Sequence, residues 1–250
     1  MVDKYIYKKI SEYFPYEPTE EQQKAIAAIA AFAADTTPRS LLILRGYAGT
    51  GKTSVLGAVV KALHAMERPS VLLAPTGRAA KVFAEYAERD AFTIHKKIYR
   101  QKSFSNDFGS FSLGKNLQKN TLFIVDEASM ISNESAGQNA FGSGHLLDDL
   151  IEYIYEDGQG CRLILSGDSA QLPPVMLRES PALSAERLRA YGMEVREVSL
   201  TQVVRQDVDS GILFNATRIR NGLWQSETTR FPVLRVEGFP DIRKVTGEDL

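Results

Sequence analysis

Short apolar runs recur along the chain and are separated by polar or turn-forming residues. The clearest runs are residues 41–44, 71–73, 122–125 and 163–165, with a weaker one at 195–200. Within the first four, consecutive positions are apolar instead of alternating with polar ones, so each strand should be covered on both faces. Helix-like segments follow several of the runs. The pattern therefore predicts an α/β fold, with a mostly parallel sheet and helices on both of its faces.

Polar residues mark the start of one helix and interrupt the pattern elsewhere. Residues 19–22 read Thr-Glu-Glu-Gln, the form of a capping box, and predict a helix from there to residue 34. Another helix is predicted over residues 146–155. Residues 101–119 combine Ser, Asn, Gly and Lys with three phenylalanines, which predicts a hairpin or small inserted subdomain around residues 106–109. A surface loop is expected over residues 132–144.

The composition is that of an ordinary globular protein. Hydrophobic residues make up 44% and charged residues 24% of the 250 positions, which excludes a disordered chain, a collagen-like repeat and a disulfide-built miniprotein. Such a length fits one large domain or two small ones. Because 30 basic residues meet 31 acidic ones, nucleic-acid binding would depend on local patches of charge.

Cysteine usage and apolar length bear on location. Cys161 is the only cysteine and adjoins an apolar run, so we expect a buried side chain and a reducing compartment. The longest apolar stretch, residues 25–34, is about half as long as a membrane-spanning helix. Residues 1–14 lack the features of a signal peptide. We therefore expect a cytoplasmic protein with no membrane partner.

The first predicted strand leads into a glycine-rich loop that matches a known phosphate-binding pattern. Residues 46–53 read Gly-Tyr-Ala-Gly-Thr-Gly-Lys-Thr and are followed by a helix-compatible segment. The glycines let backbone N–H groups surround phosphate oxygens, Lys52 would reach the β- and γ-phosphates, and Thr53 would bind Mg²⁺. The candidate nucleotide-binding residues in this loop are Gly46, Ala48, Gly49, Thr50, Gly51, Lys52 and Thr53.

Two further strand ends carry polar side chains suited to nucleotide hydrolysis. Asp126 and Glu127 follow the run 122–125; Asp126 would hold Mg²⁺ and Glu127 would orient and deprotonate water. Alone, such a pair is usually a solvated turn or helix cap, but the phosphate loop favours the metal role. Gln171 follows the run 163–165 and is a candidate sensor of the γ-phosphate. Alternatively, the two prolines at 173–174 merely close a rigid loop and leave Gln171 exposed.

The order and wording of these motifs resemble superfamily 1 helicases, specifically the RecD-like, exonuclease V α-subunit group that includes phage Dda-type helicases. The resemblance covers roughly residues 15–222. Residues 19–22 resemble an adenine-reading glutamine motif with Gln22 as the reader, and residues 46–53 resemble motif I. Residues 74–81, 92–95, 126–130, 167–175 and 200–206 resemble motif Ia, the Thr-Ile-His motif and motifs II, III and IV. In motif IV, Arg205 corresponds to an arginine that reaches the γ-phosphate.

The resemblance implies a RecA-like lobe of an ATP-dependent DNA helicase, with ATP and Mg²⁺ as ligands and 5′ to 3′ polarity in the full-length protein. It implies catalytic roles for Lys52, Glu127, Gln171 and Arg205. Members of the group continue into a second RecA-like lobe, and nothing after residue 222 matches it. We therefore expect the N-terminal lobe of a longer, monomeric protein, which binds nucleotide with little or no turnover and does not unwind DNA alone.

This interpretation divides the chain into four parts. Residues 1–98 and 120–222 form the RecA-like lobe, residues 99–119 form the inserted hairpin subdomain, and residues 223–250 begin the second lobe or a linker to it. The expected partners are that second lobe and single-stranded DNA or a single-strand/duplex junction.

Candidate DNA contacts lie in three places. The loop with Pro75 and Thr76 could offer a backbone N–H and a hydroxyl to phosphate. The segment after residue 92 combines basic and aromatic residues, as single-strand binding requires, although it also fits a basic helix face exposed to water. Phenylalanines in the hairpin could separate strands or form the core of the subdomain. The candidates are Pro75, Thr76, Thr93, His95, Lys97, Phe104 and Phe108.

Two other functions stay open. A PhoH-like ATPase shares the phosphate loop, the carboxylate pair and a Gly-Asp-x-x-Gln element; the two prolines at 173–174, Gln22 and residues 200–206 argue against it. The second alternative is a nucleotide-dependent module that binds DNA or a partner without hydrolysing the nucleotide. Glu127 argues against that function for the complete protein, although this chain alone could behave in that way.

Overall fold

The structure of the chain is a computed structural model. The structure describes residues 2–101, 111–133, 141–156, 158–174, 177, 179–204, 210–224 and 233–245. Among these residues, no helix combines the length and the apolar character that crossing a membrane requires.

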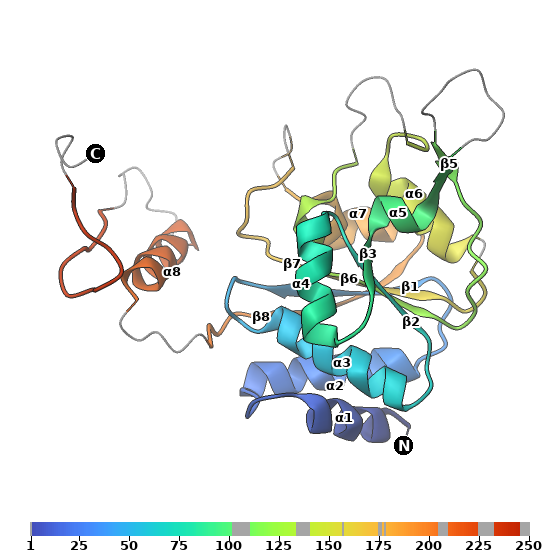
Figure 1. Cartoon of the computed structure of the whole chain (residues 1–250), viewed down its shortest axis with the longest axis horizontal. Coiled ribbons are helices and arrows are strands. Elements are labelled where there is room, and N and C mark those ends of the chain that lie inside the picture. Colours follow the sequence, from blue (N-terminus) through green and yellow to red (C-terminus); the bar gives the residue numbers. More distant parts are fainter. Residues whose placement is uncertain are drawn as a thin grey trace. The chain divides into compact units, whose positions relative to one another are not determined.

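A six-stranded parallel sheet forms the centre of the fold (Figure 1). Its strands, in spatial order, are β3 (Ala91–Thr93), β2 (Ser70–Ala74), β6 (Leu122–Val125), β7 (Arg162–Gly167), β1 (Ser40–Gly46) and β8 (Glu194–Leu200). Every neighbouring pair is parallel. The α/β prediction and its five apolar strands are confirmed. β3 was not predicted, because its three residues are only partly buried and form no apolar run.

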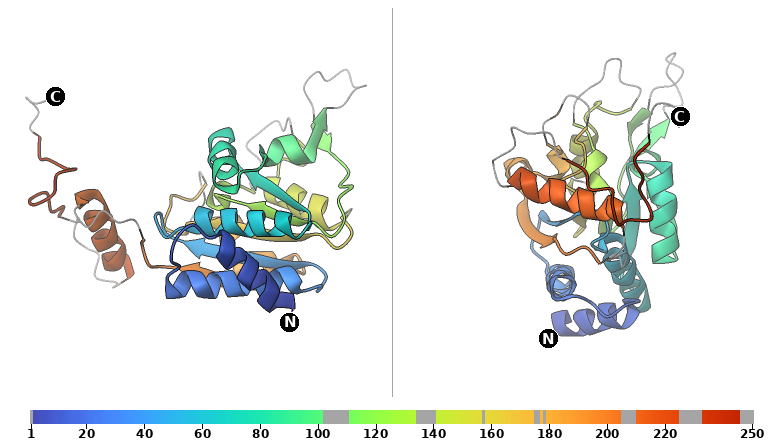
Figure 2. Two further views of the ribbon diagram at one scale, coloured as in Figure 1. Left: turned by 60° about the horizontal axis from the view of Figure 1, so that its bottom comes forward. Right: turned by 90° about the vertical axis from the view of Figure 1, so that its left-hand side faces the viewer.

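Helices cover both faces of the sheet, as the continuous apolar runs predicted (Figure 2). One core joins α1 (Val2–Tyr13), α2 (Glu20–Ala34), α3 (Lys52–Ala65) and α4 (Gly77–Ala87) to alternate strand residues such as Leu42 and Leu44. The other joins α5 (Ile94–Ile98), α6 (Leu146–Tyr155) and α7 (Ala185–Ala190) to Leu41 and Ile43. Burial of both faces excludes water from the strands, so polar groups that could bind a ligand are found at the ends of the strands.

A local signal sets where α2 begins. Thr19 and Gln22 form the predicted capping box, in which the Thr19 hydroxyl accepts from the Gln22 amide and the Gln22 side chain accepts from the Thr19 amide. The helix over residues 146–155 also lies where the sequence predicted it. Cys161 is buried, in agreement with its apolar surroundings in the sequence.

A hairpin leaves the sheet after α5. Its strands β4 (Tyr99–Gln101) and β5 (Phe111–Leu113) pair antiparallel, while residues 102–110, including Phe104 and Phe108, lie outside the described residues. The base of the hairpin is bound to α6. The Tyr99 hydroxyl donates to the buried Asp149 carboxylate at 2.6 Å, and the same carboxylate accepts from the backbone N–H and hydroxyl of Ser143.

The chain divides into two compact units between Val203 and Val204. The second unit contains α8 (Gly211–Trp224). Residues that follow α8 hold it: Asp241 caps its first turn, and Asn215 exchanges hydrogen bonds with the backbone of Arg235. The division of the chain at residues 98, 119 and 222 stays a prediction. Two short 3-10 helices, η1 (Ala128–Met130) and η2 (Pro181–Leu183), complete the first unit.

Candidate functional site

The phosphate loop, the Asp126–Glu127 pair and the loop with Gln171 each follow the end of a strand. Because all six strands are parallel, their carboxyl ends meet at one edge of the sheet, where ligands bind in open α/β folds. β1 leads into the phosphate loop, β6 into Asp126 and Glu127, and β7 into Asp168 and Gln171. Residues that are more than a hundred positions apart are thereby brought together.

The phosphate loop (residues 46–53) has the backbone geometry that its glycines allow. Gly49 and Gly51 have φ angles of 81° and 86°, in the left-handed region that other residues rarely adopt. A Cβ on Gly51 would also lie 2.6 Å from the Nε2 atom of Gln22. α3 starts directly after Gly51, so its unpaired N–H groups and positive end face the loop. The loop therefore has the shape of an anion-binding cradle.

The two constraints on Gly51 can be separated by mutation. We expect Gly51→Ala to reduce the affinity of the chain for ATP by about tenfold or more, because the loop must move away from Gln22 as well as bear a strained φ. Gly192→Ala is the matched control: Gly192 has a φ of 72° but no atom within 4 Å of the added Cβ. Titration of a fluorescent ATP analogue measures both variants, and equal affinities would contradict the expected clash.

Lys52 lies inside the curl of the phosphate loop. Its side chain is buried, and Nζ donates to the carbonyl oxygens of Gly46 at 2.7 Å and Tyr47 at 3.0 Å. These bonds hold the ammonium group against the loop backbone, beside the N–H groups that would surround phosphate. The predicted position of a cation at the phosphate site is thus compatible with the structure.

Thr53 and Asp126 form the candidate metal site. The Thr53 hydroxyl lies 2.8 Å from Oδ2 of Asp126, and Oδ1 accepts from the Ser166 hydroxyl at 2.9 Å. Asp126 is only 4% exposed. A hydroxyl and a carboxylate are the hard oxygen ligands that Mg²⁺ prefers. No cluster of three or more Asp, Glu, His or Cys side chains occurs within the described ranges, so water and phosphate would supply the other ligands.

Glu127 has an environment that favours a proton acceptor. Its backbone is left-handed with a φ of 55°, an uncommon conformation that often marks functional sites. Burial raises the pKa of its carboxyl, and the neighbouring Asp126 carboxylate raises it further, while Lys52 and a hydrogen bond from Gln171 act in the opposite direction. A raised pKa makes the carboxylate a stronger base for activating water.

Gln171 and Asp168 connect the third strand end to the other two. Oε1 of Gln171 accepts from the Ser129 hydroxyl at 3.0 Å, next to the Asp126–Glu127 pair. Asp168, only 3% exposed, accepts from the backbone N–H of Ala48 at 2.9 Å and of Ala170 at 2.8 Å. Because Asp168 joins the loop after β7 to the phosphate loop, a displacement of one loop would be transmitted directly to the other.

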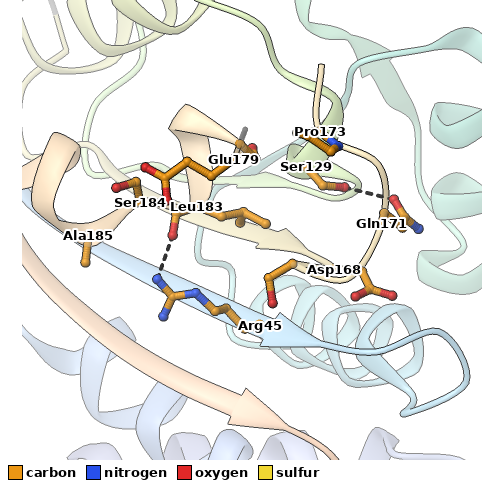
Figure 3. A pocket seen from close by; sticks show the side chains of 11 residues that line it. Arg45, Ser129, Asp168, Gln171, Pro173, Glu179, Leu183, Ser184 and Ala185 are labelled. Carbon is orange, nitrogen blue, oxygen red and sulfur yellow. Dashed lines mark hydrogen bonds between the residues drawn. The ribbon is translucent and has the colours of Figure 1, made fainter. Parts of the chain in front are cut away.

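A pocket of about 250 Å³ adjoins these residues (Figure 3). Ser129, Asp168 and Gln171 line one side, and η2 lines the other, where Arg45 donates to the carbonyl oxygen of Leu183. Gln171 is largely exposed to this space. Its amide consequently has room to exchange Ser129 for another hydrogen-bond partner.

Three residues of the site were not predicted individually: Ser129, Ser166 and Asp168. Each of these residues holds a predicted residue or the phosphate loop by a hydrogen bond. Ser129 and Asp168 lie within the segments 126–130 and 167–175, which resemble motifs II and III, and Ser166 lies near the end of β7, just before the second segment.

Gln22 contacts the phosphate loop from α2. Its side chain is 3% exposed; Nε2 donates to the Thr50 carbonyl oxygen at 3.0 Å, and Oε1 accepts from the Thr19 amide. Gln22 therefore supports the loop that would hold phosphate. Recognition of adenine by Gln22 stays a prediction.

Those predicted DNA contacts that the structure describes lie after β2, at the end of β3 and on α5, near the carboxyl ends of the strands. Pro75 precedes Thr76, whose hydroxyl caps α4, and the Thr93 hydroxyl caps α5. Burial lowers the pKa of His95, which packs against Tyr99, so its ring favours the neutral form. 

Lys97 lies on α5 beside an aromatic ring. Its Nζ is 6.0 Å from the centroid of the Phe92 ring, and burial, followed by repulsion from Arg100, lowers its pKa. α5 ends at Ile98 and a strand follows, so the segment is not one long basic helix. Arg205, like Phe104 and Phe108, lies outside the described residues.

Comparisons with known proteins agree with this architecture. A family model described as AAA domain matches residues 17–231. The ATP-dependent RecD2 DNA helicase of Deinococcus radiodurans is 29% identical over 183 residues, which are 73% of this chain and 22% of that protein. The ATP-dependent DNA helicase dda of Enterobacteria phage T4 is 28% identical over 184 residues, which are 72% of this chain and 38% of that protein. This chain thus spans less than two fifths of either relative.

A solved structure supports the fold. The crystal structure of Pif1 helicase from Candida albicans superposes with a TM-score of 0.53 at 20% identity, and the match covers 82% of this chain and 44% of that one. Identity at this level shows the RecA-like P-loop fold and nothing finer. Because the family model covers most of the residues, the chain belongs to the AAA-domain family. Its similarity to RecD2 and dda groups it with the RecD-like and Dda-type motor domains of superfamily 1.

Proposed function

We propose that this chain is the N-terminal motor lobe of an ATP-dependent DNA helicase. The observation that carries the proposal is the convergence of Lys52, the Thr53–Asp126 pair and Glu127 at one edge of the sheet. A phosphate cradle, hard oxygen ligands and a general base are the parts that nucleotide hydrolysis needs. The helicase relatives support the coupling of this hydrolysis to DNA.

The residues of the lobe would act in sequence. Lys52 would exchange its carbonyl partners for phosphate oxygens of ATP, and Thr53 and Asp126 would hold Mg²⁺. When bound, the ion would neutralise charge on the phosphates. Glu127 accepts a proton from the attacking water. Gln171, freed from Ser129, contacts the γ-phosphate and loses that contact after hydrolysis, which alters the loop after β7.

Translocation would require a second RecA-like lobe that closes on the first. We infer that the full-length protein moves 5′ to 3′ on single-stranded DNA, with Pro75, Thr76, Thr93 and Lys97 on the DNA path and Arg205 at the γ-phosphate. The position of the ends of β2 and β3 beside the nucleotide site supports this path. The lobe alone would bind nucleotide without unwinding.

DNA-stimulated hydrolysis tests this function. We expect the full-length protein to hydrolyse ATP at least about tenfold faster with an unstructured single-stranded oligonucleotide than without DNA, because closure of the two lobes on DNA completes the site. Blunt duplex DNA serves as the control and should give little stimulation. A rate that is indifferent to single-stranded DNA would contradict the helicase function and favour a PhoH-like ATPase.

Unwinding then tests polarity. Duplexes with a 5′ or a 3′ single-stranded tail should be unwound unequally, with the 5′-tailed duplex preferred. Binding of ATP with no hydrolysis under any DNA condition would instead support the nucleotide-dependent binding module.

A further inference from the structure

The Gln22 side chain is enclosed between α2 and the phosphate loop, and both ends of its amide have partners. Only 3% of the residue is exposed. Nε2 donates to the carbonyl oxygen of Thr50 at 3.0 Å, and Oε1 accepts from the backbone N–H of Thr19 at 3.0 Å. The amide therefore links the start of α2 to the loop and leaves almost no surface for a ligand to contact.

Recognition of adenine, which the resemblance implies for Gln22, needs that same amide. A glutamine reads adenine with two hydrogen bonds, one donated to N7 of the base and one accepted from its 6-amino group. For this purpose the Gln22 amide would have to turn away from Thr50 and Thr19. The exchange would leave the buried Thr50 carbonyl oxygen without this donor and would open the capping box, at a cost in free energy. The observed contacts therefore compete with a contact to the base.

The bond to Thr50 fixes one peptide unit of the phosphate loop. Thr50 is fully buried, and its hydroxyl and backbone N–H both donate to the carbonyl oxygen of Tyr47. The next residue, Gly51, lies so close to Gln22 that an added Cβ would be 2.6 Å from Nε2. Because a trans peptide unit is planar, holding the Thr50 carbonyl oxygen toward Gln22 turns the N–H of Gly51 to the opposite side, away from Gln22.

We propose that Gln22 is a positioning residue for the phosphates of the nucleotide and takes no part in selecting the base. It holds the Thr50–Gly51 peptide unit so that the Gly51 N–H faces the anion, as one donor in a cradle of backbone N–H groups. The ligand class that Gln22 serves is then any nucleoside triphosphate, or a triphosphate alone. This inference rests on the proposed function, because it assumes that residues 46–53 bind the phosphates of a nucleotide.

Competition between ligands with different bases tests this role. ATP, GTP and inorganic tripolyphosphate, each with Mg²⁺, would displace a fluorescent ATP analogue from the 250-residue chain. Gln22→Met keeps the length of the side chain but cannot donate to Thr50, so it should weaken binding of all three ligands by the same factor, about threefold to tenfold. The ratio of the ATP and GTP affinities should stay within about twofold of the parent ratio. Unchanged affinities for all three ligands would contradict the inference.

Two further variants separate the bond to Thr50 from other effects. Gln23→Met is the matched control, because Gln23 is exposed in the same helix turn, and it should bind all three ligands within about twofold of the parent. Thr19→Val removes the hydroxyl that caps α2 but leaves the bond between Gln22 and Thr50, so it should lose less affinity than Gln22→Met does. Equal losses in Thr19→Val and Gln22→Met would overturn the inference, because damage to the start of α2 would then explain both.

Hydrogen exchange gives a readout that needs no ligand. Without nucleotide, Gln22→Met should speed exchange of the Thr50 amide, whose nitrogen lies 3.3 Å from the Tyr47 carbonyl oxygen, by about threefold or more. Exchange of this amide in Gln23→Met should match the parent. A Thr50 amide that exchanges at the parent rate in Gln22→Met would overturn the inference, since the loop would then not depend on this bond.

The outcomes also separate the two proposals. A parent chain that binds none of the three ligands would overturn the proposed function and, with it, the role of Gln22. If Gln22→Met lowered the ATP affinity about threefold more than the GTP affinity, Gln22 would read adenine, and the inference alone would be overturned. A loss confined to the two nucleotides, with tripolyphosphate unaffected, would also overturn it, because Gln22 would then act on the base or the ribose.

Discussion

Replacing Glu127 with glutamine should slow ATP hydrolysis by the full-length protein about 10²- to 10⁴-fold while leaving ATP affinity nearly unchanged. Glutamine keeps the size of the side chain and an oxygen that can accept from Gln171, but it cannot take a proton from water. The substitution removes the carboxyl group of Glu127, whose pKa is raised by burial and by Asp126. Steady-state hydrolysis and fluorescent-nucleotide titration measure the two effects separately.

Glu67→Gln is the matched control for this experiment. Glu67 has a left-handed backbone with a φ of 54°, close to the 55° of Glu127, but its side chain is exposed on the turn after α3. The control should hydrolyse ATP at the parent rate. If Glu127→Gln retained a rate within about threefold of the parent, another group would have to activate the water.

The second large effect concerns the base of the hairpin. Asp149→Ala should lower the free energy of unfolding of the first unit by about 3 kcal/mol. The substitution removes a buried carboxylate that accepts three hydrogen bonds and leaves the Tyr99 hydroxyl and Ser143 without that acceptor. Burial and the bond to Asp149 raise the pKa of Tyr99, so its hydroxyl is still a donor at neutral pH. Urea unfolding followed by far-ultraviolet circular dichroism measures the loss.

Tyr99→Phe isolates the bond between the hairpin and α6. Because Ser143 still satisfies Asp149, this variant should lose only about 1 to 2 kcal/mol, and combining it with Asp149→Ala should add little. Tyr5→Phe is the control, since the Tyr5 side chain is 55% exposed, and it should match the parent. A Tyr99→Phe variant as stable as the control would show that the hairpin base is held by packing alone.

Much of the fold could be predicted because its signals are local. The runs at residues 41–44 and 163–165 are apolar at every position, because these strands are buried on both faces of the sheet. The capping box fixes the start of α2 through contacts between Thr19 and Gln22, three residues apart. The phosphate loop could be predicted as well, because its residues are consecutive in the sequence. β3 escaped prediction because it has three residues and is stabilised mainly by pairing with β2.

The supporting residues of the site could not be predicted because they depend on strand register. Val125 pairs with Leu165, so the next residues along, Asp126 and Ser166, lie side by side and form a hydrogen bond. No spacing in the sequence encodes that pairing. The same holds for Asp168, which contacts Ala48 because β7 pairs with β1. In the second unit, the start of α8 likewise depends on a residue distant in sequence, because Gly211 donates to Asp241, 30 positions further along the chain.

The single direction of the strands also makes the molecule easy to orient on a solid support. The turns that lead into the strands lie at the edge opposite to the nucleotide site, and Lys119, just before β6, is exposed there. Cys161 is buried and would not compete for thiol reagents in the folded chain. A Lys119→Cys variant could therefore be tethered through one defined point, with the phosphate loop facing the solution and accessible to nucleotide.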